Sequence, residues 1–231
     1  MKECNNICDV SSCFLCKRCL PDWLPAIQAH KKNFEVKKGE QVFREDEPVS
    51  GIYFIFNGLV KVHKRWDQEK ELIIRFSGPG DVIGYLGLGD QPIYPVTATA
   101  LEPLMLCFLS LEFLETTLNV NNRLTYSLMR LLANDLKESH KSMRDLVHMS
   151  MKARVAQALL QLKKQFGTND QGLLGIEITR QDIASYAGVS YETLFKTFNN
   201  FINSQYLSVD GKKIYINDSN ILQSLVDSDN S

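Results

Sequence analysis

Residues 179–198 carry the pattern that constrains the fold most, because they predict two short helices joined by a tight turn. Thr179, followed three residues later by Asp182, is typical of a capped helix N-terminus. Gly188 can adopt the left-handed conformation that ends a helix. Ser190 can then cap a second helix. The stretch therefore predicts a helix-turn-helix, and an ordinary helical hairpin is the alternative.

The predicted second helix has two unlike sides. Leu194 and Phe198 fall on its buried side, whereas Tyr191 and Phe195 lie near an exposed N-terminal face. Such a face can enter the major groove of DNA. We expect DNA contacts from nine residues of the motif and of the segment that follows it: Thr179, Arg180, Ser190, Tyr191, Glu192, Thr193, Lys196, Lys212 and Lys213.

A predicted wing follows the second helix. The sequence SVDGKKIYIN at 208–217 indicates two short strands around Asp210-Gly211, a dipeptide suited to a type I′ hairpin. Lys212 and Lys213 on this wing can meet phosphates, which supply affinity and register without sequence information. Residues 150–231 are therefore predicted to form a winged helix-turn-helix domain that binds double-stranded DNA.

Composition limits the kind of nucleic-acid binding that this chain can have. The 231 residues are 44% hydrophobic, enough for a substantial core, and carry a net charge of -1, which argues against a general nucleic-acid coat. Basic residues outnumber acidic ones between 151 and 217, so a local patch is available. No stretch approaches the ~20 apolar residues of a membrane span, and the N-terminus is polar. We expect a cytoplasmic protein with no membrane partner.

Short strands dominate the first half of the chain. After a cysteine-rich segment with a short helix at 1–30, strand patterns alternate with Gly and Pro turns over residues 31–119. Their regular spacing predicts a compact antiparallel barrel or roll and an α+β chain overall. No phosphate-binding glycine loop and no catalytic dyad is found, so the sequence predicts no enzyme.

A long helix is predicted over residues 120–149, which contain neither Pro nor Gly. Leu124, Leu128 and Leu131 form a stripe that can pack on the roll. A second stripe at alternating three- and four-residue steps predicts a coiled-coil dimer interface: Met129, Leu132, Leu136, Ser139, Met143 and Leu146. The alternative is that both stripes are core of one domain. We expect a homodimer, because one recognition helix reads few base pairs. A break near 148–152 then begins the DNA-binding domain.

The cysteines are unevenly placed. Clustering of this kind in a reducing cytoplasm indicates metal binding or redox sensing rather than a disulfide framework. Thiolates suit iron–sulfur clusters and zinc alike. The alternative is an unliganded tail with the last cysteine as a small buried hydrophobe. Five of the six lie in the first twenty residues and one lies alone: Cys4, Cys8, Cys13, Cys16, Cys19 and Cys107.

The order of parts, a roll, a long dimerising helix and a winged helix-turn-helix, resembles the Crp/Fnr family of bacterial transcription regulators over nearly the whole chain. The most specific matching stretches are GDVIG at 80–84, KARVAQALL at 152–160 and ITRQDIASYAGVSYETLFK at 178–196. The resemblance implies a cyclic-nucleotide-binding-like roll. It also implies a homodimer on a palindromic promoter site that recruits or blocks RNA polymerase.

The resemblance also assigns roles on the second helix of the motif. Family members offer an Arg or equivalent, then Glu, then Arg, and the matching places here are Tyr191, Glu192 and Lys196. Glu192 is expected to accept from a cytosine amino group, and Lys196 to replace the arginine at a guanine. Tyr191 is expected to change the target sequence. Exposed Tyr191 and Phe195 keep an alternative function open, a signalling protein whose ligand-binding roll acts through protein contacts without specific DNA binding.

The resemblance implies an effector pocket in the roll at Gly84, Tyr85, Tyr94 and Thr97. Members that bind cAMP carry a Gly-Glu pair and a downstream Arg-Ser, where this chain has Gly84-Tyr85 and Tyr94-Pro95. Proline offers no donor, and without the arginine a phosphate would be buried unpaired. cAMP is therefore not the expected effector. Small apolar ligands, haem and nitric oxide stay open.

The Fnr branch of the family ligates an oxygen-sensitive [4Fe–4S] cluster with three N-terminal cysteines and one in the roll. The matching set here is Cys13, Cys16, Cys19 and Cys107, for a [4Fe–4S] cluster or zinc. The spacing C-x2-C-x2-C departs from the branch's C-x2-C-x5-C, and Cys4 and Cys8 are further candidates.

Overall fold

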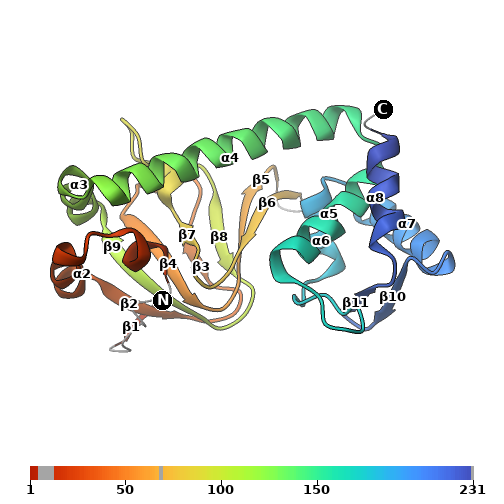
Figure 1. Cartoon of the computed structure of the whole chain (residues 1–231), viewed down its shortest axis with the longest axis horizontal. Helices are drawn as coiled ribbons and strands as arrows, with labels where there is room; N and C mark the ends of the chain where they lie inside the picture. Colours follow the sequence, from red (N-terminus) through yellow and green to blue (C-terminus); the bar gives the residue numbers. More distant parts are fainter. Residues whose placement is uncertain (5–12, 68–69, 230–231) are drawn as a thin grey trace. The chain divides into compact units, whose positions relative to one another are not determined.

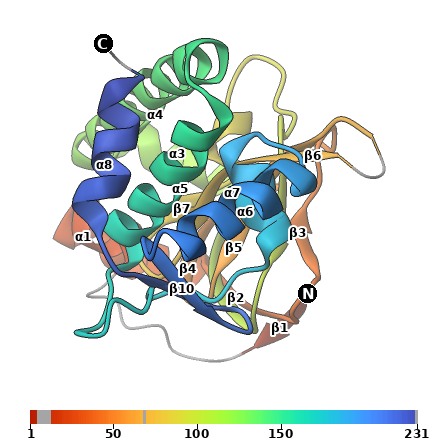
Figure 2. The same ribbon diagram turned by 90° about the vertical axis from the view of Figure 1, so that its right-hand side faces the viewer.

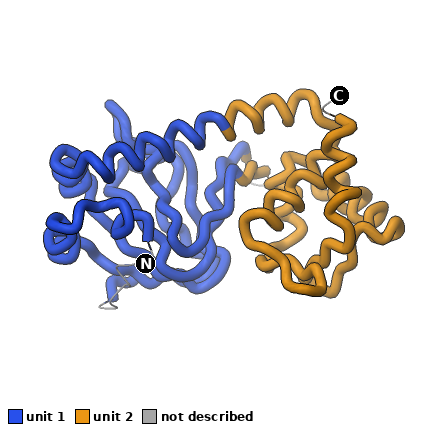
Figure 3. Tube along the Cα trace, viewed as in Figure 1, with its two compact units in different colours: residues 1–66, 74–137 blue, residues 67–73, 138–231 orange. Residues whose placement is uncertain are grey.

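The computed structural model describes residues 1–4, 13–67 and 70–229 (Figures 1 and 2). The chain divides into two compact units, one made of residues 1–66 and 74–137 and the other of residues 67–73 and 138–231 (Figure 3). The boundary falls after residue 137, inside the long helix that the sequence predicts.

Short elements open the first unit: β1 (Lys2–Cys4), α1 (Phe14–Arg18), the 3-10 turn η1 (Pro21–Trp23) and α2 (Leu24–His30). The last two confirm the short helix predicted at the end of the cysteine-rich segment, whereas α1 was not predicted. The indole of Trp23 donates a hydrogen bond to Thr117 Oγ1 at 3.2 Å. The ring of His30 stacks on Phe113 with 4.0 Å between centroids. These contacts hold the segment against the helix that follows the roll.

The predicted roll is confirmed as two sheets, with strand orders β1-β2-β9-β4-β7 and β3-β8-β5-β6. Neighbouring strands run antiparallel, as in the pairs β2–β9, β4–β9 and β5–β8. β4 is buried over most of its length, and it lies between β9 and β7 in the first sheet. The roll strands and one 3-10 turn are β2 (Lys32–Val36), β3 (Gln41–Phe43), β4 (Gly51–Asn57), β5 (Val60–Arg65), β6 (Glu71–Ser77), β7 (Val82–Ile83), η2 (Tyr85–Gly87), β8 (Thr97–Ala100) and β9 (Leu104–Ser110).

Two helices follow the roll, α3 (Leu111–Val120) and α4 (Asn122–His148), and Asn121 joins them. The long helix therefore forms nearly as predicted. Leu124 and Leu128 are buried in the apolar cluster of the first unit, and Leu131 packs against that cluster. The stripe predicted to pack on the roll is thus confirmed.

Four helices of the second unit are α5 (Met151–Phe166), α6 (Arg180–Ala187), α7 (Tyr191–Asn203) and α8 (Ser219–Ser228). The predicted break at 148–152 is confirmed, because α4 ends at His148 and Ser150 caps α5. The Ala153 amide donates to Ser150 Oγ at 3.2 Å. Figures 1 and 2 show α8 lying against α5.

The wing consists of β10 (Leu207–Asp210) and β11 (Lys213–Ile216). Asp210 pairs with Lys213, so the loop residues are Gly211 and Lys212, one position later than predicted. Of these two, only Gly211 has a positive φ, +57°. A type I′ turn needs a positive φ at both positions. The predicted hairpin is therefore confirmed, but the predicted type I′ turn is wrong. The register of the two strands decides which residues form the loop, and it places the loop one residue later.

Candidate nucleic-acid interface and sensor elements

Helix α6 begins and ends at the predicted residues. The Asp182 amide donates to Thr179 Oγ1 at 3.0 Å, and the Thr179 amide donates to Asp182 Oδ2 at 3.3 Å, which completes a capping box. Gly188 ends the helix in the left-handed conformation at φ +63°. A Cβ at Gly188 would lie 2.7 Å from Leu146 Cδ2, and Arg154 Nη1 donates to the Gly188 carbonyl at 3.1 Å. The left-handed φ therefore favours glycine at the turn between the two helices.

Helix α7 has the predicted buried side. The Thr193 amide donates to Ser190 Oγ at 3.1 Å and caps the helix. Leu194 and Phe198 are completely buried one turn apart. Their burial fixes which side of α7 faces outward.

The outward side of α7 carries two aromatic and two charged residues. Tyr191 and Phe195 are 48% and 46% exposed. Glu192 and Lys196 are also exposed and form an ion pair with 2.6 Å between Oε1 and Nζ. The hydrogen bond from Lys196 lowers the pKa of Glu192. Each pair is spaced i,i+4, so an aromatic row and a charged row run side by side along the helix.

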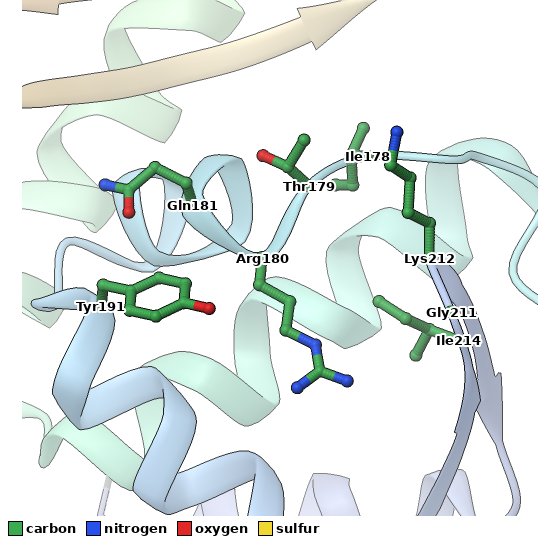
Figure 4. A pocket seen from close by; sticks show the side chains of 8 residues that line it. All are labelled: Ile178, Thr179, Arg180, Gln181, Tyr191, Gly211, Lys212 and Ile214. Atoms are coloured by element: carbon green, nitrogen blue, oxygen red, sulfur yellow. The ribbon is translucent and has the colours of Figure 1, made fainter.

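A cavity of about 340 Å³ lies where α6, α7 and the wing meet (Figure 4). Figure 4 shows the phenol of Tyr191 pointing toward Arg180, with Lys212 on the wing. The Arg180 guanidinium also lies 5.7 Å from the centroid of the Phe198 ring, a cation–π position. Two cations and a helix N-terminus at one hollow suit an anionic group such as a phosphate. The lining residues are Ile178, Thr179, Arg180, Gln181, Tyr191, Gly211, Lys212 and Ile214.

The structure brings four of the nine predicted contact residues to this cavity: Thr179, Arg180, Tyr191 and Lys212. The others lie on the adjoining turns of α7 and on β11. Gln181 lines the cavity and was not predicted, although its place in the first turn of α6 could have indicated it. Phe195 was noted as exposed but was not predicted as a DNA contact.

The predicted dimer stripe on α4 is exposed to solvent along its length. Large apolar side chains rarely gather on a free surface without a partner. This stripe differs in that respect from Leu124 and Leu128 on the same helix, which are buried. The exposed residues are Met129, Leu132, Leu136, Ser139, Met143 and Leu146.

The predicted effector residues in the roll are packed among aromatic rings. Tyr94 is 1% exposed, donates a hydrogen bond to the Gly51 carbonyl at 2.7 Å and stacks on Phe43 with 4.1 Å between centroids. Phe43 also stacks on Tyr53. Gly84 has φ +92°, and a Cβ there would lie 3.3 Å from the Tyr94 ring. The polar atom of Tyr94 is thus used within the protein.

Tyr85 and Thr97, the other predicted effector residues, also have protein partners. The Tyr85 hydroxyl donates to Asp135 Oδ2 on α4 and accepts from Arg75 Nη1 at 2.5 Å. The Arg75 guanidinium lies 3.4 Å from the same carboxylate. Burial, together with the hydrogen bond to Asp135, raises the pKa of Tyr85. Thr97 Oγ1 accepts from the Glu45 amide at 3.1 Å. Tyr85 therefore links the roll to α4 within the first unit.

The four predicted metal ligands are buried in one apolar cluster of the first unit, and they supply four thiols, the donors that an iron–sulfur cluster or a structural zinc takes. Within residues 1–4, 13–67 and 70–229, however, no three Cys, His, Asp or Glu side chains are grouped so that they could hold a metal ion. The donor type fits and the arrangement does not. Cys8 lies outside the described residues, and Cys4 ends β1. The four are Cys13, Cys16, Cys19 and Cys107.

Asn121, between α3 and α4, connects this cluster to the long helix. Its side chain is completely buried, and its Nδ2 donates to Cys19 Sγ at 2.9 Å. Its Oδ1 accepts from the Leu124 amide at 3.1 Å and so caps the first turn of α4. Arg123 adds a bond from Nη2 to the Lys17 carbonyl at 3.3 Å. Burial raises the pKa of the Cys19 thiol. Sequence reasoning missed Asn121 entirely.

Comparison with known proteins finds two family models that match two successive parts of the chain. Residues 33–121 match the cyclic nucleotide-binding domain, and residues 153–225 match the Crp-like helix-turn-helix domain. The fumarate and nitrate reduction regulatory protein of Vibrio cholerae is 30% identical over 217 residues, which are 88% of this chain and 84% of that protein. The CRP-like cAMP-activated global transcriptional regulator of Mycobacterium tuberculosis is 28% identical over 201 residues, which cover 86% of this chain and 90% of that protein. The structure of FixK2 from Bradyrhizobium japonicum has a TM-score of 0.75 at 24% identity, covering 84% of this chain and 96% of that one.

The roll, the long helix and the exposed recognition helix define a transcription regulator with a helix-turn-helix DNA-binding domain. The chain belongs to the Crp/Fnr family. Its relatives are transcription regulators rather than enzymes, in agreement with the sequence prediction. No helix among the described residues is long and apolar enough to cross a membrane.

Proposed function

We propose that the protein binds a palindromic promoter site as a homodimer and places α7 of each subunit in the major groove. The observation that carries this proposal is the outward face of α7, with Glu192 and Lys196 exposed beside the cationic hollow at Arg180 and Lys212. Polar side chains near the start of a recognition helix reach base edges, while cations beside it meet phosphates.

Glu192 and Lys196 act as base readers in this proposal. Glu192 accepts a hydrogen bond from a cytosine amino group, and Lys196 donates to a guanine. In the free protein these two side chains are bonded to each other at 2.6 Å, so reading requires the ion pair to open or to be shared with the bases. An exposed pair of this kind contributes little stability, so opening it costs little.

Phosphate contacts come from the residues around the readers. Arg180 and Lys212 face the cavity, and Lys213 is exposed at the start of β11. The hydroxyl oxygens of Thr179 and Ser190 cap α6 and α7, and the hydroxyl of Thr193 bonds that of Ser190. Thr179 Oγ1 also donates to Asp182 Oδ2 at 2.5 Å, so a bond to a phosphate oxygen would replace that bond while the oxygen keeps its acceptor role in the cap. These contacts set register and affinity rather than sequence preference.

The exposed stripe of α4 forms the homodimer interface in this proposal. Two such stripes pack as a coiled coil and remove large apolar side chains from water. The dimer supplies two recognition helices, which matches a two-fold symmetric site. RNA polymerase is the proposed protein partner on the promoter, and the cytoplasm is the compartment where the two meet.

The signal enters through the first unit. Cys13, Cys16, Cys19 and Cys107 are proposed as the sensing residues, either as ligands of a [4Fe–4S] cluster or zinc, or as thiols. A bound cluster would supply reactivity toward oxygen, and α1 would have to shift so that its thiols converge. Anaerobic purification with absorbance, iron and zinc assays tests the ligand role, and a colourless, metal-free protein excludes it.

cAMP is not the proposed effector. Tyr85 and Tyr94 stand near the places where cAMP-binding members hold the ribose and the phosphate, and both hydroxyls are bonded within the protein. Gly84, Tyr85, Tyr94 and Thr97 remain the proposed region for any other small effector. Calorimetric titration with cAMP is expected to give no heat, and micromolar binding would overturn this part of the proposal.

The DNA-binding proposal is tested by selecting duplexes from a random-sequence pool with the intact protein. A palindromic consensus is expected. Glu192→Ala and Lys196→Ala are each expected to weaken binding to that consensus by about 10- to 100-fold, since each good base contact contributes ~1–3 kcal/mol. Asn220→Ala, at an exposed position of α8 outside the helix-turn-helix, is the control and leaves binding unchanged. Unchanged specific binding by both reader variants would show that the readers are wrongly assigned.

A further inference from the structure

Phe195 is an aromatic residue on the outward face of α7 to which the proposed function gives no role. It is 46% exposed, whereas Leu194 beside it in sequence and Phe198 one turn later are completely buried. The core of the helix-turn-helix is therefore complete without Phe195. Exposing half of an aromatic ring gains nothing for folding, because its apolar surface stays in water.

The position of Phe195 places it among the base readers. It is adjacent in sequence to Lys196 and four residues after Tyr191, so it lies on the aromatic row that runs beside the Glu192–Lys196 row. A helix that puts its N-terminal half in the major groove brings both rows to the base edges. This step rests on the proposed function, namely that α7 enters the groove.

The chemistry of the phenyl ring selects what it can contact there. A phenylalanine side chain has no hydrogen-bond donor or acceptor, so it can read neither the nitrogen and oxygen atoms of the bases nor a phosphate. The major-groove edges offer one apolar group, the C5-methyl group of thymine. Packing against it would remove both the methyl group and part of the ring from water.

We propose that Phe195 is a specificity-determining residue that packs against a thymine methyl group in each half-site of the operator. Glu192 and Lys196 then select cytosine and guanine by hydrogen bonds, while Phe195 selects thymine by an apolar contact. The two kinds of readout are independent, because removing a methyl group leaves every hydrogen-bonding atom of the base pair in place.

The experiment uses the intact protein and the consensus duplex selected from the random pool. Each thymine of the half-site is replaced in turn, in both half-sites, by deoxyuridine, which lacks only the methyl group. At one thymine position we expect the wild-type affinity to fall about fifteenfold, since a buried methyl group contributes about fourfold and the dimer has two of them. Phe195→Ala is expected to bind the thymine and uracil duplexes equally. Phe195→Leu, which keeps an apolar side chain, is expected to retain part of the discrimination.

The controls separate this inference from the proposed function. Lys196→Ala should weaken binding to both duplexes and leave the ratio between thymine and uracil unchanged. If wild-type protein selects a consensus but binds all uracil duplexes as tightly as thymine duplexes, or if the half-site contains no thymine, the inference is wrong while the proposed function stands. Discrimination retained in Phe195→Ala also overturns the inference. A failure to select any consensus refutes the proposed function itself.

Discussion

The roll and the recognition helix use the same kinds of side chain in opposite ways. Tyr85 and Tyr94 in the roll are buried, and each hydroxyl is bonded to a protein group. Tyr191 and Phe195 on α7 are nearly half exposed. In the roll, Tyr85 and Tyr94 therefore stabilise the fold and connect its elements. On α7, Tyr191 and Phe195 keep part of their apolar surface in contact with solvent.

This difference implies two classes of response to substitution. Changes on the outward surfaces of α4 and α7 should impair assembly or DNA binding and leave the fold intact. Changes to the inward groups should lower the free energy of unfolding. An outward substitution that lowers stability, or an inward one that does not, would contradict this difference.

The largest effect is expected on the outward stripe of α4. Leu136→Glu should raise the dimer dissociation constant by about a thousandfold or more, because each subunit loses a buried apolar side chain of about 2–5 kcal/mol and two acids then face each other. Asn134→Glu adds the same charge on the side of α4 away from the stripe, and it should leave the dimer unchanged. Sedimentation equilibrium measures both. If Leu136→Glu sediments like the wild type, the stripe is not the dimer interface.

Inward groups give the next largest effect. Asp135→Ala removes the carboxylate that both Tyr85 and Arg75 contact, and should lower the free energy of unfolding by about 2–3 kcal/mol. Tyr85→Phe removes only the hydroxyl and should cost about 1 kcal/mol. Tyr126→Phe makes the same chemical change at an exposed position of α4 and should cost nothing. Urea unfolding compares the three. Equal stability of the Tyr85 and Tyr126 variants would show that the buried network is not stabilising.

Asn121 tests whether the cysteine cluster and the start of α4 are joined. Asn121→Ala should cost about 1–2 kcal/mol, since it removes both the cap of Leu124 and the donor to Cys19. Asn121→Asp keeps a capping oxygen and loses the donor. It also places a carboxyl group at a completely buried position, so this variant should be less stable than the wild type as well. Cys19 loses its hydrogen bond from Nδ2 in both variants, so the rate at which it reacts with a maleimide should change in both. Peptide mass spectrometry follows that rate, and identical rates in the wild type and both variants would mean that Asn121 does not influence Cys19.

The sequence predicted the recognition elements well, because their signals are local. Thr179, Gly188 and Ser190 specify where two helices begin and end through contacts a few residues away. The inward connections could not be predicted in the same way. Asn121 and Cys19 are 102 residues apart, and no periodicity or cap links them. The preference of Asp-Gly for tight turns predicted the turn of the wing one residue too early, because the register of the two strands, and not the dipeptide, determines the loop.

The prediction and the structure differ most at the cysteines proposed as sensing residues. Composition identified the cysteines as a group, and the fold does place Cys13, Cys16, Cys19 and Cys107 in one cluster. Whether thiols converge on a metal depends on the orientation of α1, a five-residue helix whose existence no pattern indicated. Residue type therefore indicates candidate donors, whereas the orientation of the backbone that carries them cannot be predicted from residue type.

The smallest effect is expected at Asp145, a buried residue of the second unit. Its substitution tests whether burial, rather than the unit in which a residue lies, decides that the residue contributes to stability. Burial acts to raise the pKa of Asp145, but hydrogen bonds from Gln157 and Arg144 outweigh it and hold the pKa below its ordinary value. A carboxyl whose pKa is lower in the folded state stabilises that state above its unfolded pKa of about 3.9, and this contribution is lost as the pH falls through the lower folded value. The stability that Asp145 contributes should therefore be present at about pH 5 and should decrease as the pH falls to about 3. Asp145→Asn should lose less over the same interval, and Asn220→Ala, which removes no titratable group at an exposed position of α8, should follow the wild type. Urea unfolding at both pH values measures the difference. Parallel losses in all three proteins would mean that the buried carboxylate does not contribute, and that burial alone does not decide which groups of this chain stabilise it.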